Sequence, residues 1–400
     1  MFPDYDPRHL AHRRAPLDLL SPLREATPLV HNPAIGGWML LRFDDVHEAL
    51  RDHRLSNARI QSYAAHLRQR GEDPGPIADS LANWMVFNDP PRQMELRLMV
   101  AKTFGTRSMV RLRASIEEIV HRLIDRIQPA GQADLIADFA VPLPTLVIAR
   151  LLGVPEADAP MLKSWSDEIA LFVGTSLDVP DRRQRAERAV LAMRSYLEEQ
   201  AASRTIDIDG TLIGTILRAQ LDGHPVTLGE AADIALSIVF AGHETTTHLL
   251  GNGLRQLLSH PDAWQCLVAG QLSPEAAVEE CLRFEGPVNA VARVVREPHE
   301  RLGQLLQPGE RLFLMLGAAN RDPRRFDDPD TFRPHRGDHR HLAFGFGTHF
   351  CLGALLARLE ATTAITALAT RLPGLRLLPD EPDWLDSLVL RGMRSLPATF

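Results

Sequence analysis

The sequence has few cysteines and few lysines. Its three cysteines, Cys266, Cys281 and Cys351, give neither a disulfide framework nor the paired spacing of a zinc site. Such low usage is typical of a reducing compartment, so we expect a cytoplasmic protein. Lys102 and Lys163 are the only lysines. Positively charged patches must therefore consist of arginine, which holds its charge and binds carboxylates in a two-pronged fork.

An excess of positive charge and a long apolar run near the start are also missing. The formal net charge of −7 argues against general nucleic-acid binding. Residues 1–20 mix acidic, basic and histidine side chains, so we expect neither a signal peptide nor a membrane anchor. The 400 residues are 45% hydrophobic and 24% charged, which is enough for a large globular core, and they contain no repeats.

Helical periodicity dominates the remaining sequence, and strand patterns are short. We therefore expect a mainly α fold with small peripheral β-sheets. A hairpin is expected over Arg301–Phe313, with Pro308-Gly309 in its turn. Besides those discussed below, the expected helices are Val110–Ile127, Leu143–Leu152, Met161–Phe172 and the charged, amphipathic Arg182–Arg204, and the expected strands are Leu29–Val30, Trp38–Leu41, Leu375–Leu378 and Ser387–Leu390.

A long apolar helix is expected after Thr227-Leu228-Gly229-Glu230, which has the pattern of a capping box, and it should end near His260-Pro261. Its middle, Ala241–His248, is unusual for a buried helix. Gly242 lowers helix stability by about 1 kcal/mol relative to Ala, and the Glu and Thr side chains that follow it need partners when buried. Either they meet other helices or water, or they serve a function.

One cysteine lies in a glycine-rich loop directly before another helical pattern. The loop reads His341–Gly353, with Cys351 between Gly347 and Gly353. The positive end of a helix N-terminus favours the thiolate over the thiol, and glycine lets the backbone approach a flat ligand closely. A lone cysteine is most often a small buried hydrophobe, so the sulfur has two readings from local features alone.

The spacing within this loop is more specific. Phe344-Gly345-Phe346-Gly347-Thr348-His349-Phe350-Cys351-Leu352-Gly353 resembles the haem-binding loop of the cytochromes P-450, with no departure from its pattern. The resemblance implies that Cys351 is the axial ligand of the iron of haem b (iron protoporphyrin IX). It also implies that Phe344 and Gly345 bind the cofactor and that His349 binds a haem propionate.

The long helix resembles the same family. Ala-Gly-x-Glu-Thr-Thr at Ala241–Thr246 matches the family's acid–alcohol motif. By this resemblance Thr245 would donate a hydrogen bond to bound dioxygen and Glu244 would relay protons from water. Ala241 and Gly242 would leave room for dioxygen over the iron.

Further family positions concern the haem edge. Arg97, on a helix that Pro90-Pro91 opens, matches a propionate-binding arginine, although by itself it reads as part of a solvated helix face. Gln93 stands where the family usually has a histidine; it can donate a hydrogen bond but carries no charge. Arg293 matches the second propionate arginine.

A structural pair completes the resemblance. Ser273-Pro274 should start a helix that Gly286-Pro287 stops. Within it Glu280-x-x-Arg283 matches a family signature whose two residues join a later basic residue in a brace. We align Arg336 to that role, with Arg333 as the alternative.

The resemblance implies one haem-thiolate domain over residues 1–400, which inserts one atom of O2 into a small, mainly apolar molecule. Electrons would come from a ferredoxin or flavodoxin and an NAD(P)H-dependent reductase, and the enzyme would be a soluble monomer. The alternatives are a peroxygenase that uses H2O2 and a haem-binding sensor without turnover. The candidate pocket residues, any of which could instead be core, are Trp84, Val86, Phe240, Ala241, Val288, Val291 and Met393.

Overall fold

The computed structural model describes residues 5–173, 180–203, 211–379 and 381–400. These residues form two compact units. Unit 1 comprises Met1–Leu55, Leu112–Leu143 and Thr245–Phe400, and unit 2 comprises Ser56–Arg111 and Pro144–Glu244.

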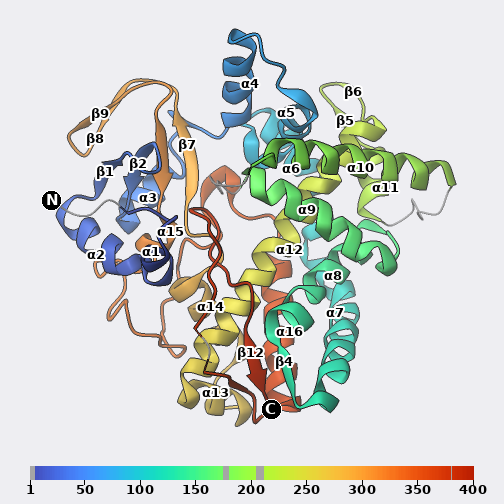
Figure 1. Ribbon diagram of the computed structural model, residues 1–400, viewed down its shortest axis with the longest axis vertical. Helices are drawn as coiled ribbons and strands as arrows, with labels where there is room; N and C mark the ends of the chain where they lie inside the picture. The colour runs from blue at the N-terminus through green and yellow to red at the C-terminus, as the bar shows by residue number, and fades with distance from the viewer. Residues whose placement is uncertain (1–4, 174–179, 204–210, 380) are drawn as a thin grey trace. The chain divides into compact units, whose positions relative to one another are not determined.

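Unit 1 holds most of the sheet structure and the helices of the C-terminal half. Figure 1 shows α14 beside α16, and these two helices pack against each other. Its helical elements are α1 (Leu10–Arg14), α2 (Pro16–Ala26), α3 (Phe43–Ala49), η3 (Gln128–Ala130), η4 (Leu135–Ala140), α13 (Pro261–Val268), α14 (Pro274–Glu285), α15 (Leu316–Ala319), η6 (Gly347–His349) and α16 (Ala354–Arg371).

The largest sheet of unit 1 has five strands in the order β1-β2-β10-β7-β3. Strand β2 runs antiparallel to β1 and parallel to β10, and β10 is antiparallel to β7. A second sheet has the order β11-β12-β4, and β8 and β9 form a hairpin. The strands are β1 (Leu29–Asn32), β2 (Gly37–Leu40), β3 (Leu55–Ser56), β4 (Gln132–Asp134), β7 (Val291–Val295), β8 (His299–Arg301), β9 (Gln304–Leu306), β10 (Arg311–Leu314), β11 (Arg376–Leu377) and β12 (Pro397–Thr399).

Both faces of the five-stranded sheet are buried. Leu312 and Leu314 of β10 belong to one apolar cluster, and Phe313 belongs to another. Successive side chains of a strand point to opposite faces. Helix α3 covers the first face with Phe43 and Val46, and α2 contributes to the second cluster. The sheet therefore forms a rigid support for the residues that follow β10.

Unit 2 is almost entirely helical. Figure 1 shows α10 running along α9, and the two helices pack together. Helix α10 is amphipathic, with Ala186, Val190 and Met193 buried. The elements are α4 (Arg59–Gln69), α5 (Gly75–Ala82), η1 (Met85–Phe87), α6 (Arg92–Ala101), η2 (Lys102–Phe104), η5 (Glu156–Asp158), α9 (Ala159–Val173), α10 (Arg182–Ser203), α11 (Leu212–Leu217) and the two-stranded pair β5 (Gln220–Leu221) and β6 (His224–Pro225).

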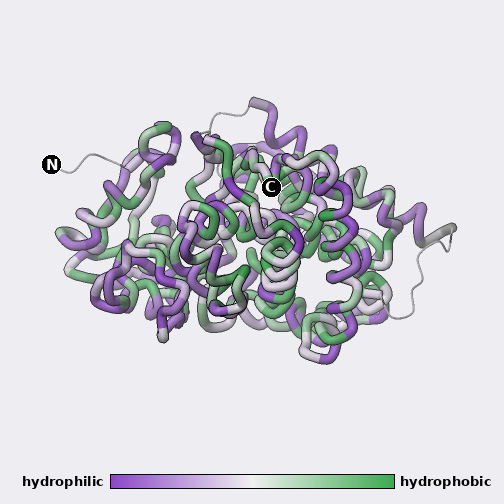
Figure 2. Tube along the Cα trace, turned by 90° about the horizontal axis from the view of Figure 1, so that it is seen from below, coloured by the Kyte–Doolittle hydropathy of each residue, from purple (hydrophilic) through white to green (hydrophobic). Residues whose placement is uncertain are grey.

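Three helices have residues in both units: α7 (Thr106–Ile127), α8 (Pro142–Leu152) and α12 (Leu228–Ser259). Hydrophilic and hydrophobic residues alternate along the helices in Figure 2, as expected where one helix face is buried. One helical stretch of the described residues, Leu135–Leu152, is long and apolar enough to match a membrane span. It is 67% buried, as the core helix of a globular protein would be.

The expected mainly α fold with small sheets is confirmed, and so are the principal helix boundaries. The Thr227 hydroxyl accepts from the Glu230 N–H at 3.2 Å while the Glu230 carboxylate accepts from the Thr227 N–H at 2.9 Å, which is the predicted capping box. The Ser273 hydroxyl likewise accepts from the Ala276 N–H at 3.1 Å. The charged helix ends at Ser203 in the structure, and Arg204 lies outside the described residues.

Two strand predictions were wrong. The hairpin turn is at Leu302-Gly303, where both residues have positive φ, and not at Pro308-Gly309, because β10 pairs with β7 and β2 instead of with β9. Ser387–Leu390 forms no named strand, although Leu390 makes an isolated bridge with Val288. The last strand is instead β12, which lies between β11 and β4.

Candidate functional site

Cys351 lies at the end of a tightly turned loop in unit 1. Its N–H donates to the Phe344 carbonyl at 2.9 Å, which closes the loop. Gly345 and Gly347 have φ of +68° and +74°, where a side chain would be strained. Helix α16 begins at Ala354, three residues after the sulfur-bearing residue. The N-terminus of a helix therefore lies next to Cys351, where its positive end favours a thiolate.

The three cysteines have different surroundings. They form no disulfide, and Cys351 and Cys266 are partly exposed. Cys281 of α14 is 1% exposed, and burial raises the pKa of its thiol. Only Cys351 combines partial exposure with a glycine loop and a following helix. This sulfur is thus the one whose setting suits a metal thiolate, and Cys281 is a packing residue.

Phe344 connects the loop to the helices behind it. The Arg358 guanidinium of α16 lies 4.4 Å from the centroid of the Phe344 ring. Arg358 also donates two hydrogen bonds, of 2.6 and 3.0 Å, to the Glu279 carboxylate of α14. His341 Nε2 lies 3.3 Å from the same carboxylate. Burial raises the pKa of Glu279, but hydrogen bonds from His341 and Arg358 outweigh burial and lower this pKa to about 2.

The structure brings Glu280, Arg283 and Arg336 together. Arg283 donates to both oxygens of Glu280, at 2.7 and 2.8 Å, and both side chains are fully buried. Arg336 Nε lies 3.4 Å from Glu280 Oε2. Arg333, the alternative in the alignment, contributes its backbone N–H to Glu280 at 2.7 Å, while its side chain pairs with Asp328 at the surface.

Arg283 and Arg336 also bind the chain that leads to the cysteine loop. Arg283 donates to the carbonyls of Asn320, at 3.0 Å, and Pro329, at 2.9 Å. Both arginines donate to the Thr331 carbonyl at 3.3 Å. Carbonyl groups of an irregular segment are thus satisfied by two buried cations, which fixes that segment without regular secondary structure.

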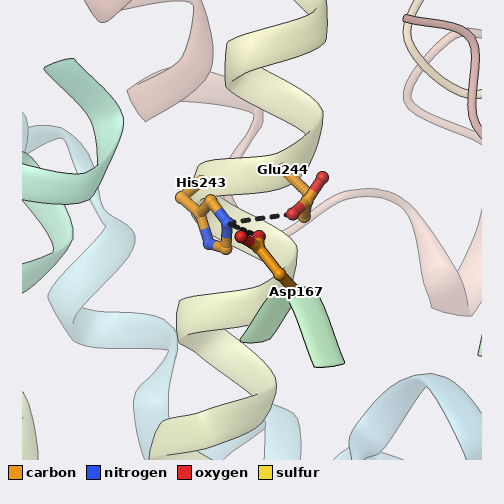
Figure 3. Close-up of side chains that lie close together, drawn as sticks. All are labelled: Asp167, His243 and Glu244. Atoms are coloured by element: carbon orange, nitrogen blue, oxygen red, sulfur yellow. Dashed lines mark hydrogen bonds and ion pairs between the residues drawn. The ribbon is translucent and has the colours of Figure 1, made fainter. Parts of the chain in front are cut away.

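The acid–alcohol segment of α12 falls at the boundary between the units, so its two halves are described separately. In unit 2, Ala241 is exposed although most of the helix before it is buried. The Ile148 side chain packs so closely on Gly242 that a Cβ there would lie 2.5 Å from Ile148 Cδ1. Glu244 Oε1 lies 3.0 Å from His243 Nε2, and Oδ1 of Asp167, on α9, lies 3.6 Å from the same nitrogen (Figure 3).

In unit 1, the same helix continues through Thr245, Thr246 and Thr247 without interruption. Thr245 is partly buried, and the other two threonines are buried. The Thr247 hydroxyl donates to the Ala140 carbonyl at 3.1 Å. Thr247 therefore has a packing role, which leaves Thr245 as the threonine of this run that is less enclosed.

The propionate candidates are divided between the units. In unit 1, Arg293 is buried on β7 and donates to the Ala292 carbonyl at 3.0 Å, and His349 ends η6. In unit 2, Gln93 and Arg97 lie one turn apart on α6, and Gln93 is fully buried whereas Arg97 is partly exposed.

The pocket candidates differ in exposure. Trp84 is fully buried, with its ring centroid 5.3 Å from that of Phe240 and 6.0 Å from that of Phe87. Val86 is exposed. Met393 is buried, and its Cε is 3.9 Å from where a Cβ on Gly251 would lie, so it packs on α12. Val288 and Val291 are partly buried and pack against the cluster on one face of the five-stranded sheet.

Sequence reasoning missed Asp167, Glu279 and Arg358. Each makes its contact with a residue far away in the chain, so no local pattern marked it. His341 and Arg358 are close to Cys351 in the sequence, but nothing in the sequence indicated that both would pair with the Glu279 carboxylate.

The residues present fit a haem iron. The chemistry of the donor set is that of one thiolate, from a partly exposed cysteine on a glycine loop before a helix. This arrangement is that of a haem-thiolate protein.

Comparison with known proteins agrees with this class. The family model for cytochrome P450 matches residues 274–372. Cytochrome P450 monooxygenase PikC of Streptomyces venezuelae is 37% identical over 367 residues, covering 90% of this chain and 84% of that protein. Polyketide biosynthesis cytochrome P450 PksS of Bacillus subtilis (strain 168) is 32% identical over 393 residues, covering 96% and 95%. The crystal structure of CalO2 has a TM-score of 0.92 at 31% identity, covering 99% and 98%.

The chain therefore belongs to the cytochrome P450 family and has its fold. It is a haem-thiolate monooxygenase of the bacterial type, as the resemblance in the sequence implied, and its relatives include a polyketide biosynthesis enzyme. Its cofactor is a haem iron, and it uses small-molecule substrates and redox partners.

Proposed function

We propose that residues 1–400 form one haem-thiolate domain in which the Cys351 thiolate would hold the iron of haem b. The observation that carries this assignment is the closed loop from Phe344 to Cys351, followed directly by α16. The haem supplies oxygen activation, which a strongly donating thiolate promotes. The overall reaction consumes the substrate, O2, two electrons and two protons, and it yields the oxygenated substrate and water.

The protein's own residues hold the cofactor and handle the protons. Arg293 and His349 in unit 1, and Arg97 and Gln93 in unit 2, would bind the propionates, with Gln93 as a neutral donor. Arginine is suited to this because its fork matches a carboxylate. Phe344 and Gly345 would lie against the macrocycle, since Gly345 keeps that part of the loop free of a side chain.

Glu244 and Thr245 would deliver protons to the reacting oxygen, and Ala241 would leave space for it. A general acid must be within hydrogen-bond reach of its acceptor, directly or through one water. The Thr245 hydroxyl can donate to a neighbouring oxygen while it accepts from another donor. Glu244 is mostly enclosed, with 13% of its side chain exposed, so it reaches solvent through few routes.

Electrons would come from a ferredoxin or flavodoxin with an NAD(P)H-dependent reductase, and the enzyme would act as a cytoplasmic monomer. The acidic carrier would be attracted by arginines on α6 and α7, Arg97, Arg107, Arg111 and Arg113. The substrate would be mainly apolar. Phe240, Val288 and Val291 are apolar, their side chains are partly exposed, and in the sequence they stand close to residues that are proposed to bind the cofactor. A polyketide-like substrate is suggested by the name of PksS.

The alternative activity is that of a peroxygenase. An enzyme that accepts H2O2 receives its oxygen with both protons and both electrons already attached, so it needs no proton relay. The presence of Glu244 and Thr245 in one helix favours the O2-dependent reaction. A sensor without turnover would not need these residues either.

The experiment is expression of the wild-type chain and Cys351→Ser with a haem precursor. The reduced wild type treated with carbon monoxide should show the absorption band of a thiolate-ligated haem, and Cys351→Ser should not. Cys266→Ser is the matched control, since Cys266 is also partly exposed but lies on α13, and it should keep the band. A full band in Cys351→Ser would refute the assignment.

A further inference from the structure

Three ionisable side chains meet on α9 and α12, and the reaction as proposed above uses only one of them. His243 Nε2 lies 3.0 Å from Glu244 Oε1 and 3.6 Å from Asp167 Oδ1. Figure 3 shows the two carboxylates approaching the same ring nitrogen from α12 and α9. All three residues belong to unit 2.

The other ring nitrogen of His243 also faces an acceptor. Nδ1 lies 2.9 Å from the Val239 carbonyl oxygen, one turn earlier in α12. A carbonyl oxygen only accepts, so Nδ1 must carry a hydrogen. A carboxylate also only accepts when ionised, so Nε2 carries a second hydrogen unless Glu244 itself is protonated. The His243–Glu244 pair therefore holds one mobile proton next to Thr245.

The three side chains differ in their exposure to solvent, and this difference sets the direction in which a proton would move. The Asp167 side chain is 42% exposed, whereas that of His243 is 1% exposed and that of Glu244 is 13% exposed. Asp167 can thus exchange protons with water, and His243 cannot do so directly. Lys163 also pairs with Asp167, from one turn earlier on α9, so this carboxylate is held at the surface by a cation.

We propose that Asp167 and His243 form the entry to the proton relay, with Asp167 collecting protons from solvent and His243 Nε2 passing them to Glu244. The proposal rests on the proposed function, because it extends the role given there to Glu244. His243 is a positioning and proton-carrying residue, and it does not contact the substrate.

Each transfer leaves a stable form of the ring. The Nε2–H bond breaks as a bond forms between the proton and Glu244 Oε1, and the imidazole remains neutral with its hydrogen on Nδ1, bonded to Val239. A proton from solvent, taken up by Asp167, then returns to Nε2. Two such cycles supply the two protons that O2 and two electrons require for each oxygen atom released as water.

The environment of His243 keeps the ring charged at rest. Burial lowers the pKa of His243, but hydrogen bonds from its ring to Asp167 and Glu244, with the Val239 carbonyl, outweigh burial and raise this pKa to about 9. Among the described residues, the charged groups facing the ring are Asp167 on α9 and Glu244 on α12, with Lys163 one contact further away. The ring is therefore protonated at neutral pH and ready to donate.

The test compares Asp167→Asn with Asp167→Glu and Glu168→Gln. Asn keeps the size of Asp and an acceptor oxygen but cannot carry a proton, and Glu restores a carboxylate. Glu168 is the next residue on α9 and pairs with Arg185 instead of His243, so its variant controls for loss of one acid from that helix. Haem content is measured by the carbon monoxide band, and product and peroxide are measured per electron pair consumed.

With O2 and the redox partner, Asp167→Asn should form product about ten-fold less efficiently per electron pair. This is less than the roughly 10²–10⁴-fold that a directly acting general acid contributes, because Asp167 acts through His243. Asp167→Glu should recover most of this loss, and Glu168→Gln should match the wild type. With H2O2 as oxidant all four proteins should form product at similar rates, because that oxidant brings its own protons. Equal losses with both oxidants, or no loss in Asp167→Asn, would overturn the proposal.

A second readout does not depend on turnover. The protein is labelled with 15N-histidine and studied by NMR as the diamagnetic ferrous carbon monoxide complex. The signal of His243 is the one that is absent from His243→Gln, and at pH 7 it should report a doubly protonated ring. This signal should titrate at lower pH in Asp167→Asn. A neutral ring at pH 7 would refute the relay even if the enzyme is active, whereas absence of the thiolate–haem band from the wild type would refute the proposed function instead.

The same groups have the ligand types of a divalent-cation site, since a histidine and two carboxylates have ligand atoms within 4.8 Å of one another. Under the proposal, EDTA leaves the yield of product per electron pair unchanged. A loss of yield in EDTA that Zn2+ restores would mean that the cluster is a metal site, and it would overturn the relay.

Discussion

Glu279 of α14 and Arg358 of α16 form a two-point ion pair behind the cysteine loop, with N···O distances of 2.6 and 3.0 Å. The same arginine covers one face of Phe344. Because α16 begins just after Cys351, this pair fixes the helix whose N-terminus the sulfur approaches. The ion pair therefore couples the stability of the fold to the geometry of the proposed iron ligand.

This coupling predicts a specific acid sensitivity. The pKa of Glu279 is about 2 in the folded protein, against an ordinary value of 4.5. A carboxyl with a lowered pKa stabilises the fold fully above its unfolded-state value and loses that contribution as pH falls from 4.5 through about 2. The contribution is on the order of 3 kcal/mol. The free energy of unfolding of the wild type, measured with urea, should therefore fall more steeply with decreasing pH over this range than that of Glu279→Gln.

The control for this measurement is Glu275→Gln. Glu275 is an exposed acid in the first turn of the same helix, so its variant should follow the wild-type pH profile. Parallel profiles for the wild type and Glu279→Gln would show that the ion pair does not stabilise the protein.

The brace residues should differ in the cost of their removal. Arg336→Ala removes a cation that lies 3.4 Å from the buried Glu280 and binds nearby carbonyls, so it should destabilise the fold by about 3 kcal/mol. Arg333→Ala removes a side chain that pairs at the surface, and it should change stability by less than about 1 kcal/mol. Guanidinium unfolding of both variants decides this, and equal costs would contradict the assignment of Arg336.

The sequence was most informative where structure depends on neighbours in the chain. The capping box at Thr227 and the Ser273-Pro274 helix start predicted real boundaries, because a cap and its N–H partner are three residues apart. Pro308-Gly309 misled the hairpin prediction, since β10 finds its partners in β2 and β7. Long-range pairing of this kind is decided by packing of the whole sheet and leaves no local pattern.

The same difference between short-range and long-range contacts applies to the candidate site. The Cys351 loop and the Glu280–Arg283 pair were readable because their residues follow one another at short spacing. Asp167 could not be identified in this way, because its partner His243 lies 76 positions further along the chain. The sequence also offered no reason to expect Ile148 against Gly242, which is the contact that explains the glycine in structural terms.

Thr245 should control how oxygen is used. Thr245→Ala removes the hydroxyl that would donate to the reacting oxygen, so the haem should remain bound while product per electron pair falls roughly 10-fold or more and peroxide rises. Thr247→Ala is the matched control, because its hydroxyl donates to the Ala140 carbonyl instead. That variant should cost about 1 kcal/mol of stability with unchanged peroxide release. Unchanged product yield in Thr245→Ala would remove the role proposed for this threonine.

Gly242 provides a test that separates packing from oxygen binding. A Cβ at this position would lie 2.5 Å from Cδ1 and 3.0 Å from Cγ1 of Ile148, whose side chain is buried, so Gly242→Ala should destabilise the fold by roughly 1–3 kcal/mol. Ile148→Val removes Cδ1, the closer of the two atoms, and should relieve most of the clash. The double variant should then be more stable than the sum of the single changes by about 1 kcal/mol or more in a double-mutant cycle, helped by the better helix propensity of Ala.

The double variant also tests the function of the glycine. If Gly242 is required only because Ile148 packs against it, Gly242→Ala with Ile148→Val should regain product per electron pair together with stability. If the glycine leaves room for dioxygen, the double variant should be stable but should release peroxide in place of product. Measuring unfolding free energy and product yield on the same four proteins separates these outcomes, because the clash affects both quantities and the oxygen site affects only the yield.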